Sequence, residues 1–341
     1  MPPLDDPGRL RAAKQAAWNL LQQLPGPDTA RRCADLLHPQ CLWVASHPVH
    51  TLNGPQAVAE GFFAPLMAAL PDIERRTDLF FAGHWDGHID GGAGFWVTCH
   101  GHYLGTMQAP LFGIPASGEP VWLRFGEFYR VGDDGLIAEA RVLLDLVDLA
   151  RQVGRPVLPP ATGMELLVPG PRGGGGVLLG DGDPAQGQAS YELVMAMIGG
   201  LGRYDRSNLQ SMGMSAFWHP QMMWYGPGGI GSSRAIAGFE RHHQKPFLTA
   251  LPDRKGGHHR ARFAEGPFVA STGWPSVRAT HLGPYLGEPA SGKPIGLRVM
   301  DWWRAEGGLL VENWVLLDLP DLFLQLGVDI LARARQHPTE G

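Results

Sequence analysis

EARVLLDLVDLARQVG, residues 139–154, returns later in the chain as ENWVLLDLPDLFLQLG, residues 312–327. An earlier motif returns as well: residues 37–40 read Leu-His-Pro-Gln, and residues 218–221, 181 positions later, read Trp-His-Pro-Gln. A solenoid unit is only tens of residues long, so a repeat of this length indicates a duplicated domain. Each functional residue of one copy can therefore be compared with its counterpart in the other.

The repeat divides the 341 residues into two domains joined by a linker. We place the first copy at 1–154 and the second at 188–341, each large enough for a hydrophobic core of its own. The segment between them, 155–187, is rich in proline and glycine, a composition typical of a connecting segment rather than of a packed core.

Composition excludes several classes of function. The net charge is −5 and no basic block is present, which argues against binding to nucleic acid. The first residues lack the basic start and apolar run of a signal peptide, and no apolar run is long enough to span a membrane. The three cysteines, an odd number, indicate reduced thiols, so we expect a cytoplasmic protein without disulfides.

In each copy, segments with apolar residues at helical spacing come first and extended segments follow. This order predicts an α+β domain whose helices pack against an antiparallel meander. The spacing between the copies shortens from 181 at Leu37 to 174 at Leu123, so the first copy has seven extra residues, which we place in a hairpin loop at 84–92. The expected strands are 73–82, 94–107, 120–131 and 136–145, and then 257–265, 267–281, 293–304 and 309–317.

One acid stands among apolar and aromatic neighbours on the third long strand of each copy. Alternation places Asp301 on one face with Val299 and Trp303, and Glu127 on one face with Tyr129. A buried carboxylate has a raised pKa, as a general acid or base requires. The alternative is an acid that forms a salt bridge with an arginine of a neighbouring strand.

A second pair of acids, Asp318 and Asp145, stands where the last strand ends and a helix begins. Aspartate is a favoured N-cap residue, which explains its presence there without any catalytic role. Because Asp321 or Asp148 could cap the helix instead, Asp318 and Asp145 remain candidates for a pocket.

Histidine distinguishes the two copies, because Met107 stands where the second copy has His281. His281 is a candidate proton donor, and His100 and His102 could replace it in the first copy. No third ligand is specified near His100 and His102, so we expect no metal site.

Tryptophan is frequent, with eleven residues in the chain. Aromatic rings on a concave sheet can hold a flat hydrophobic ligand, although they are equally suited to a core. The candidate substrate-binding residues are Trp224, Trp303, Trp314, Trp43 and Tyr129.

Together these motifs resemble the SnoaL-like polyketide cyclase family, part of the nuclear-transport-factor-2-like superfamily of cone-shaped α+β barrels. The resemblance is carried in the second copy by Thr280-His281-Leu282-Gly283, Ser291-Gly292, Glu312-Asn313-Trp314, Asp318 and Gln325-Leu326-Gly327. The first copy matches at Gly105-Thr106, Gly118, Glu139, Asp145 and Gln152-Val153-Gly154, and departs at Met107 and Arg141. The resemblance implies two tandem cones, each with helices packed in a strongly curved antiparallel sheet, that associate as an intramolecular pseudo-dimer.

The resemblance also implies an intramolecular aldol cyclisation of a small hydrophobic carbonyl compound, without metal or cofactor. Asp318 would remove a proton and His281 would donate to the developing oxyanion, while Asp301 would tune either group or be the base itself. Asp145 and Glu127 would be the counterparts in the first copy. A hydrolase or dehydratase with the same pocket, and a catalytically silent binding module, remain open alternatives because this fold hosts many activities.

Overall fold

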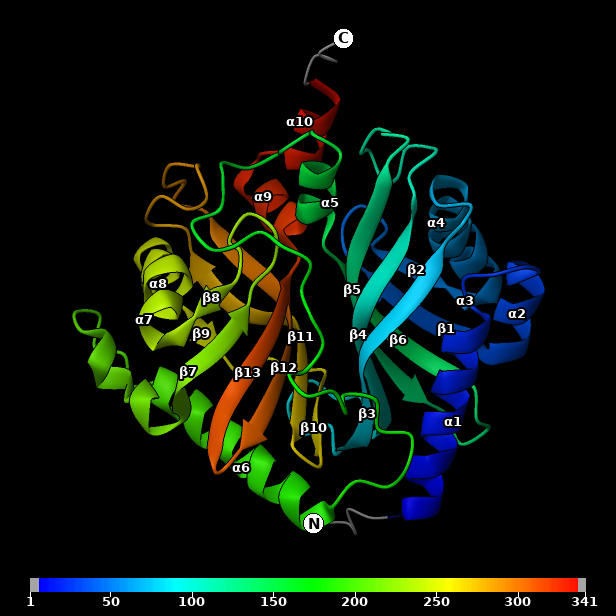
Figure 1. Cartoon of the computed structure of the whole chain (residues 1–341), viewed down its shortest axis with the longest axis horizontal. Coiled ribbons are helices and arrows are strands. Elements are labelled where there is room, and N and C mark those ends of the chain that lie inside the picture. Colours follow the sequence, from blue (N-terminus) through cyan, green and yellow to red (C-terminus); the bar gives the residue numbers. More distant parts are fainter. Residues whose placement is uncertain (1–5, 337–341) are drawn as a thin grey trace.

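The computed structural model describes residues 6–336 and contains two α+β units that follow the sequence repeat (Figure 1). The first unit consists of α1 (Pro7–Gln23), α2 (Thr29–Leu36), β1 (Leu37–Ala45), β2 (Thr51–Asn53), α3 (Gly54–Val58), a π-helical turn η1 (Ala59–Phe63), α4 (Ala64–Ala69), β3 (Glu74–Trp85), β4 (Gly94–Thr106), β5 (Pro120–Val131), β6 (Ile137–Leu144) and α5 (Leu146–Gln152).

The second unit repeats this order. It consists of α6 (Pro184–Leu201), 3₁₀ turns η2 (Leu209–Met212) and η3 (Met214–Ala216), β7 (Trp218–Tyr225), β8 (Ser233–Arg234), α7 (Ala235–Phe239), a π-helical turn η4 (Glu240–Gln244), α8 (Lys245–Ala250), β9 (Lys255–Gly256), β10 (Ala261–Glu265), β11 (Phe268–Thr280), β12 (Pro294–Glu306), β13 (Leu309–Leu317), α9 (Leu319–Leu326) and α10 (Ile330–Gln336).

The strands form one mixed sheet in each unit. The orders are β2-β1-β6-β5-β4-β3 and β10-β11-β12-β13-β7-β8, with β9 paired to β11. The long strands are antiparallel, as predicted, whereas β1 and β7 join them in parallel to β6 and β13. Each sheet curls around its helices without closing, which confirms the predicted α+β fold of two tandem cones (Figure 1).

Local sequence signals begin the first helix of each unit in the same way. The carboxylate of Asp6 accepts hydrogen bonds from the amides of Gly8 and Arg9, and Asp183 caps α6 through Ala185 and Gln186. A proline follows each cap, at the helical position that needs no amide hydrogen. Residues 209–216 form two 3₁₀ turns instead of one continuous helix, because Gly213 between them has a φ of 65° that a helix cannot continue through.

The two units pack sheet against sheet as an intramolecular pseudo-dimer, with α1–α4 outside one sheet and α6–α8 outside the other (Figure 1). Trp302 of β12 inserts at Gly126 of β5, where an added Cβ would lie 2.3 Å from the indole ring. The Trp302 indole N–H donates to Thr98 Oγ1 across the interface at 2.7 Å. Only glycine therefore allows this close approach of the two sheets.

The linker contacts both units. Its residue Val177 pairs with Phe80 of β3, and Met164 pairs with Ser232 of the second unit. Between residues 155 and 183 it contains no helix or extended strand among the named elements. None of the helices in residues 6–336 has the length and apolar character needed to cross a membrane.

Gly126→Ala is expected to lower the free energy of unfolding by about 1–3 kcal/mol, the usual cost of overpacking a core. Gly199→Ala is the matched control, because this α6 glycine has no atom within 4 Å of an added carbon and alanine gains about 0.5–1 kcal/mol in a helix. Thermal unfolding of the two variants measures the difference. Equal melting temperatures would show that Gly126 is not required for the sheet packing.

Candidate functional site

The second unit contains a cavity of about 730 Å³ between the concave face of its sheet and its helices. Apolar and aromatic side chains make most of the wall, including Leu201, Trp224, Phe239, Phe247 and Val299. This volume lies in the range that small-molecule sites occupy, and walls of this composition are typical of them.

Asp301 lies on the sheet wall of this cavity. The residues Leu297, Val299, Asp301 and Trp303 all line it, so the predicted alternation of β12 is correct. Among the described residues Asp301 forms no salt bridge, and its carboxylate accepts one side-chain hydrogen bond, from the amide of Asn313 at 3.4 Å. One oxygen of the carboxyl group therefore accepts from Asn313, and no basic side chain of residues 6–336 separates the group from the cavity.

Burial controls the protonation of Asp301. Desolvation raises its pKa from 3.8 to about 7, while the hydrogen bond from Asn313 and the charge of Arg262 act in the opposite direction. A carboxyl with a pKa near neutrality can both accept and return a proton under ordinary conditions.

His243 lines the cavity from the helical side, and sequence analysis missed it. Its ring stacks on Trp224 with centroids 4.4 Å apart and lies 5.3 Å from the ring of Phe247. Burial lowers its pKa to about 3, so the imidazole is neutral, and its Nδ1 has no hydrogen-bond partner among the described residues. A neutral imidazole has one N–H group, which can donate a hydrogen bond to a carbonyl oxygen.

The first unit is filled at the corresponding position. Arg75 donates to Glu127 at 2.7 and 3.2 Å, and its guanidinium also donates to Tyr103 and lies over the ring of Phe125. Glu127 is therefore paired, as the salt-bridge alternative predicted. Trp43 and Tyr129, two predicted substrate-binding residues, are fully buried in this core.

Three substitutions between the copies open the second unit. Strand register aligns Arg75 with Gly256, Tyr103 with Val277 and Phe125 with Val299. All three smaller residues line the cavity. The cavity is therefore the space that an arginine and two aromatic rings occupy in the first unit, and the same loss leaves Asp301 without the partner that Glu127 has.

Asp318 and Asp145 lie at the interface between the units and not in the cavity. Asp318 accepts from the amide of His47 at 3.1 Å, and Asp145 accepts from the amide of Gly228 at 2.8 Å. His47 and Gly228 are counterparts in the repeat, so the two contacts are symmetric. Each acid also caps the helix that follows it, α9 or α5. The predicted catalytic role thus has no geometric support for either residue.

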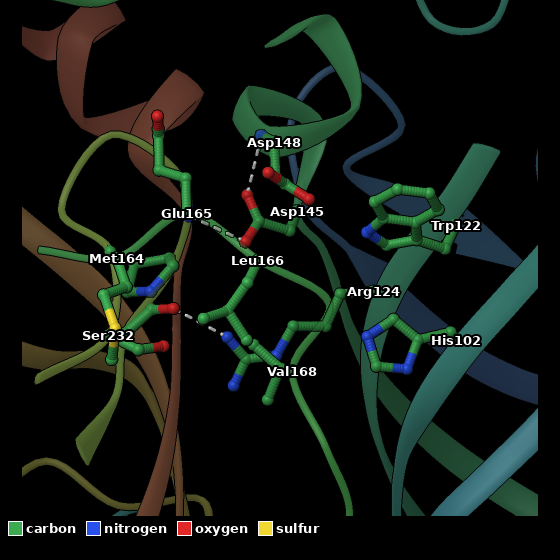
Figure 2. Close-up of a pocket in the computed structure, with 14 residues that line it drawn as sticks. His102, Trp122, Arg124, Asp145, Asp148, Met164, Glu165, Leu166, Val168 and Ser232 are labelled. Carbon is green, nitrogen blue, oxygen red and sulfur yellow. Dashed lines mark hydrogen bonds between the residues drawn. The ribbon is translucent and has the colours of Figure 1, made fainter. Parts of the chain in front are cut away.

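Figure 2 shows Asp145 and Arg124 facing linker residues Met164 and Glu165 across a small space between the units. This space measures about 10 Å³, room for about one water molecule. Burial raises the pKa of both Asp145 and Asp318 to about 6. The raised pKa reflects a dry interface rather than a substrate pocket.

Two further predicted residues also lie outside the cavity lining. His281 is buried, with its Nδ1 3.1 Å from the hydroxyl of Ser291 in its own loop. Trp314 faces the other unit, stacks on Tyr225 and donates to the carbonyl oxygen of Pro169. Of the predicted substrate-binding residues, the structure brings Trp224 and Trp303 together with Asp301.

The seven-residue insertion of the first unit reaches the cavity of the second. Its residue Ile89 is part of the cavity lining. The carbonyl oxygen of the next residue, Asp90, accepts from Arg260 at 2.7 Å, and its carboxylate lies 3.5 Å from His258. The first unit therefore contributes a wall residue to the cavity of the second.

The curled mixed sheets and the cavity on one concave face define two tandem cone-shaped α+β domains. More narrowly, the chain belongs to the SnoaL-like polyketide cyclase family, whose model matches residues 20–153 and 203–326. The family therefore covers both units and leaves out the linker.

Solved structures give single-domain matches. AclR from Streptomyces galilaeus is 23% identical and covers 41% of this chain and 96% of its own, with a TM-score of 0.34. A putative SnoaL-like polyketide cyclase from Jannaschia sp. CCS1 is 17% identical and covers 45% of this chain and 98% of its own, with a TM-score of 0.37. IdmH from Streptomyces antibioticus is 23% identical and covers 39% of this chain and 98% of its own, with a TM-score of 0.32. No curated protein matches the chain.

Asp301→Asn is expected to stabilise the protein increasingly as the pH rises from about 4 to about 8. Between pH 3.8 and about pH 7 the carboxyl group of Asp301 is ionised in the unfolded chain and protonated in the folded chain. The stability of the wild type therefore falls as the pH rises through this range. Asparagine cannot ionise and escapes the loss, which amounts to about 1.4 kcal/mol for each unit of pKa difference.

Chemical denaturation of wild type and Asp301→Asn across this pH range measures the effect. The titration of Asp145 and Asp318 is common to both proteins and cancels in the difference. A stability difference that stays constant with pH would show that Asp301 has an ordinary pKa.

Proposed function

We propose that the second unit is a cofactor-independent acid/base catalyst of the cyclase type, acting on a small hydrophobic carbonyl compound. The observation that carries this proposal is the unpaired Asp301 on the wall of a largely apolar cavity. We assign the base to Asp301 instead of Asp318, since only Asp301 can reach a molecule in the cavity.

The proposed reaction begins with proton removal. The Asp301 carboxylate takes a proton from a carbon next to a carbonyl group, and the electron pair moves onto the carbonyl oxygen to give an enolate. The enolate carbon then attacks a second carbonyl of the same molecule and forms the new carbon–carbon bond. Asp301 returns its proton to the resulting alkoxide, so the reaction is an isomerisation without net proton change.

Two features of the cavity support this sequence. His243 is neutral and lines the cavity, which fits a hydrogen-bond donor to the enolate oxygen. Trp224 and Trp303 provide flat apolar surfaces that can orient a planar substrate. The low polarity of the walls strengthens the interaction between a developing negative charge and a fixed donor.

Deuterium exchange tests the first step without knowledge of the natural substrate. A flat aromatic ketone such as 2-acetylnaphthalene is incubated with the protein in D₂O, and mass spectrometry follows deuteration of the methyl group. Wild type is expected to accelerate exchange, with a rate that rises as pH passes the Asp301 pKa of about 7. Asp301→Asn should lose about 100-fold or more of this rate.

Binding of the same ketone, followed by tryptophan fluorescence, should change by less than about threefold in Asp301→Asn, because the apolar contacts remain. Glu306→Gln is the matched control, an exposed acid at the end of the same strand. Unchanged exchange in Asp301→Asn would contradict the base assignment. Binding without any exchange in wild type would favour a silent binding module instead.

A further inference from the structure

Arg262 of β10 is a buried cation in the cavity wall. Arg262 is 3% exposed and contributes to the cavity lining. Within residues 6–336, no carboxylate oxygen forms a salt bridge with its guanidinium, whereas Arg75 in the first unit has Glu127. Burying an unpaired charge costs several kcal/mol, so a position of this kind needs an explanation.

The hydrogen-bond partners of Arg262 are neutral. Nε donates to Ser271 Oγ at 3.3 Å, one terminal nitrogen contacts His259 Nε2, and the other donates to the weak acceptor Met195 Sδ at 3.1 Å. Burial lowers the pKa of His259 to about 3, so this imidazole carries no charge. Neither His259, Ser271 nor Met195 compensates the charge of the arginine.

The hydrogen-bond pattern leaves donors of two cavity-lining residues, Arg262 and Ser271, without an acceptor. Because His259 Nε2 accepts from Arg262, the proton of the neutral ring is on Nδ1, which donates to Ser271 Oγ at 3.1 Å. Ser271 Oγ thus accepts two hydrogen bonds, and its own hydroxyl hydrogen is available to a third group. Arg262 also has N–H groups beyond the three already engaged. These groups can donate to a further acceptor, and a negative charge satisfies them best.

The position of this cluster relates it to the proposed base. Strand register places Arg262 beside Ser271, Ser271 beside Asp301, and Asp301 beside Val315 on neighbouring strands. Cross-strand neighbours share one face, so these residues form a row across the cavity wall. Arg262 and Asp301 are two strands apart, about 10 Å between their backbones.

The first unit shows that the fold does not need these polar groups. There the same register places Phe80 and Cys99 in the row with Glu127. Both are buried in the apolar core. The arginine and serine are therefore specific to the unit with the cavity.

We propose that Arg262, His259 and Ser271 form an anion subsite, and that the substrate carries a delocalised oxyanion, a carboxylate or an ionised enol, at one end. This inference rests on the proposed function, because it describes the substrate that the same cavity would bind. The oxyanion binds Arg262 and Ser271, and the carbon that reacts lies further along the row, over Asp301. The two ends of the substrate are thus separated by up to two strand spacings, about 10 Å.

A pair of fluorescent probes tests the subsite. Anilinonaphthalene sulfonate is anionic, and N-phenyl-1-naphthylamine has the same ring framework without the sulfonate. Arg262→Met keeps the side-chain volume and removes the charge, so sulfonate binding should weaken by about tenfold or more. Binding of the neutral probe should stay within about twofold, because its contacts are apolar.

Two variants control for the loss of charge and for folding. Arg278→Met removes an exposed arginine of β11 outside the cavity and should bind both probes as wild type does. Ser271→Ala retains the charge of Arg262 and should weaken only the sulfonate, by about threefold to tenfold. Ser271→Ala decides the matter even if Arg262→Met does not fold, because Arg206 and Arg254 also line the cavity and the wild-type preference for the anionic probe does not separate them from Arg262.

Equal affinity of wild type for both probes, no binding of the sulfonate, or equal weakening of both probes in Arg262→Met would overturn the subsite. None of these outcomes depends on turnover. Deuterium exchange that is lost in Asp301→Asn would still support the base when the subsite fails, and sulfonate selectivity would stand if the exchange test fails.

Discussion

A carboxylate on the concave face of a curled sheet loses much of its hydration, so it must either be paired or have a raised pKa. The two units meet this constraint in different ways. Arg75 neutralises Glu127 and, with Tyr103 and Phe125, fills the first cone. Gly256 replaces the arginine in the second cone, and Asp301 has a pKa near 7 beside an open cavity. The first cone is thus filled, and the second contains the cavity.

The duplication is held together by the convex faces of the sheets. Trp302 packs on Gly126, and Glu139 accepts two hydrogen bonds of 2.6 Å from Arg260 of the second unit. The buried acids Asp145 and Asp318 bind backbone amides across this interface. Since Ile89 of the first unit lines the cavity of the second, the scaffold also shapes the site. This contact gives a physical reason for two units in one chain.

The repeat, the strands and the face that carries Asp301 were predictable, because alternation along a strand has a period of two residues. The location of Asp318 was not, because both faces of each sheet are buried here. In the second unit one face lines the cavity and the other packs on the partner sheet, so apolar alternation could not tell on which face Trp314 and Asp318 lie. Comparison of the copies contained the missing signal. At the spacing of 181, His243 aligns with Phe62 and Gly256 with Arg75. That these differences open a cavity can be inferred only once the structure shows that the positions meet in the core.

The central claim is that the second unit alone offers a ligand cavity and that Asp301 lies on its wall. The most direct measurement is a crystal structure of the full chain soaked with 2-acetylnaphthalene. The account predicts density for one molecule per chain, between Trp224 and Asp301, with the first cone still filled by Arg75. A molecule bound beside Glu127, or in the interface at Asp318 and Asp145, would contradict it.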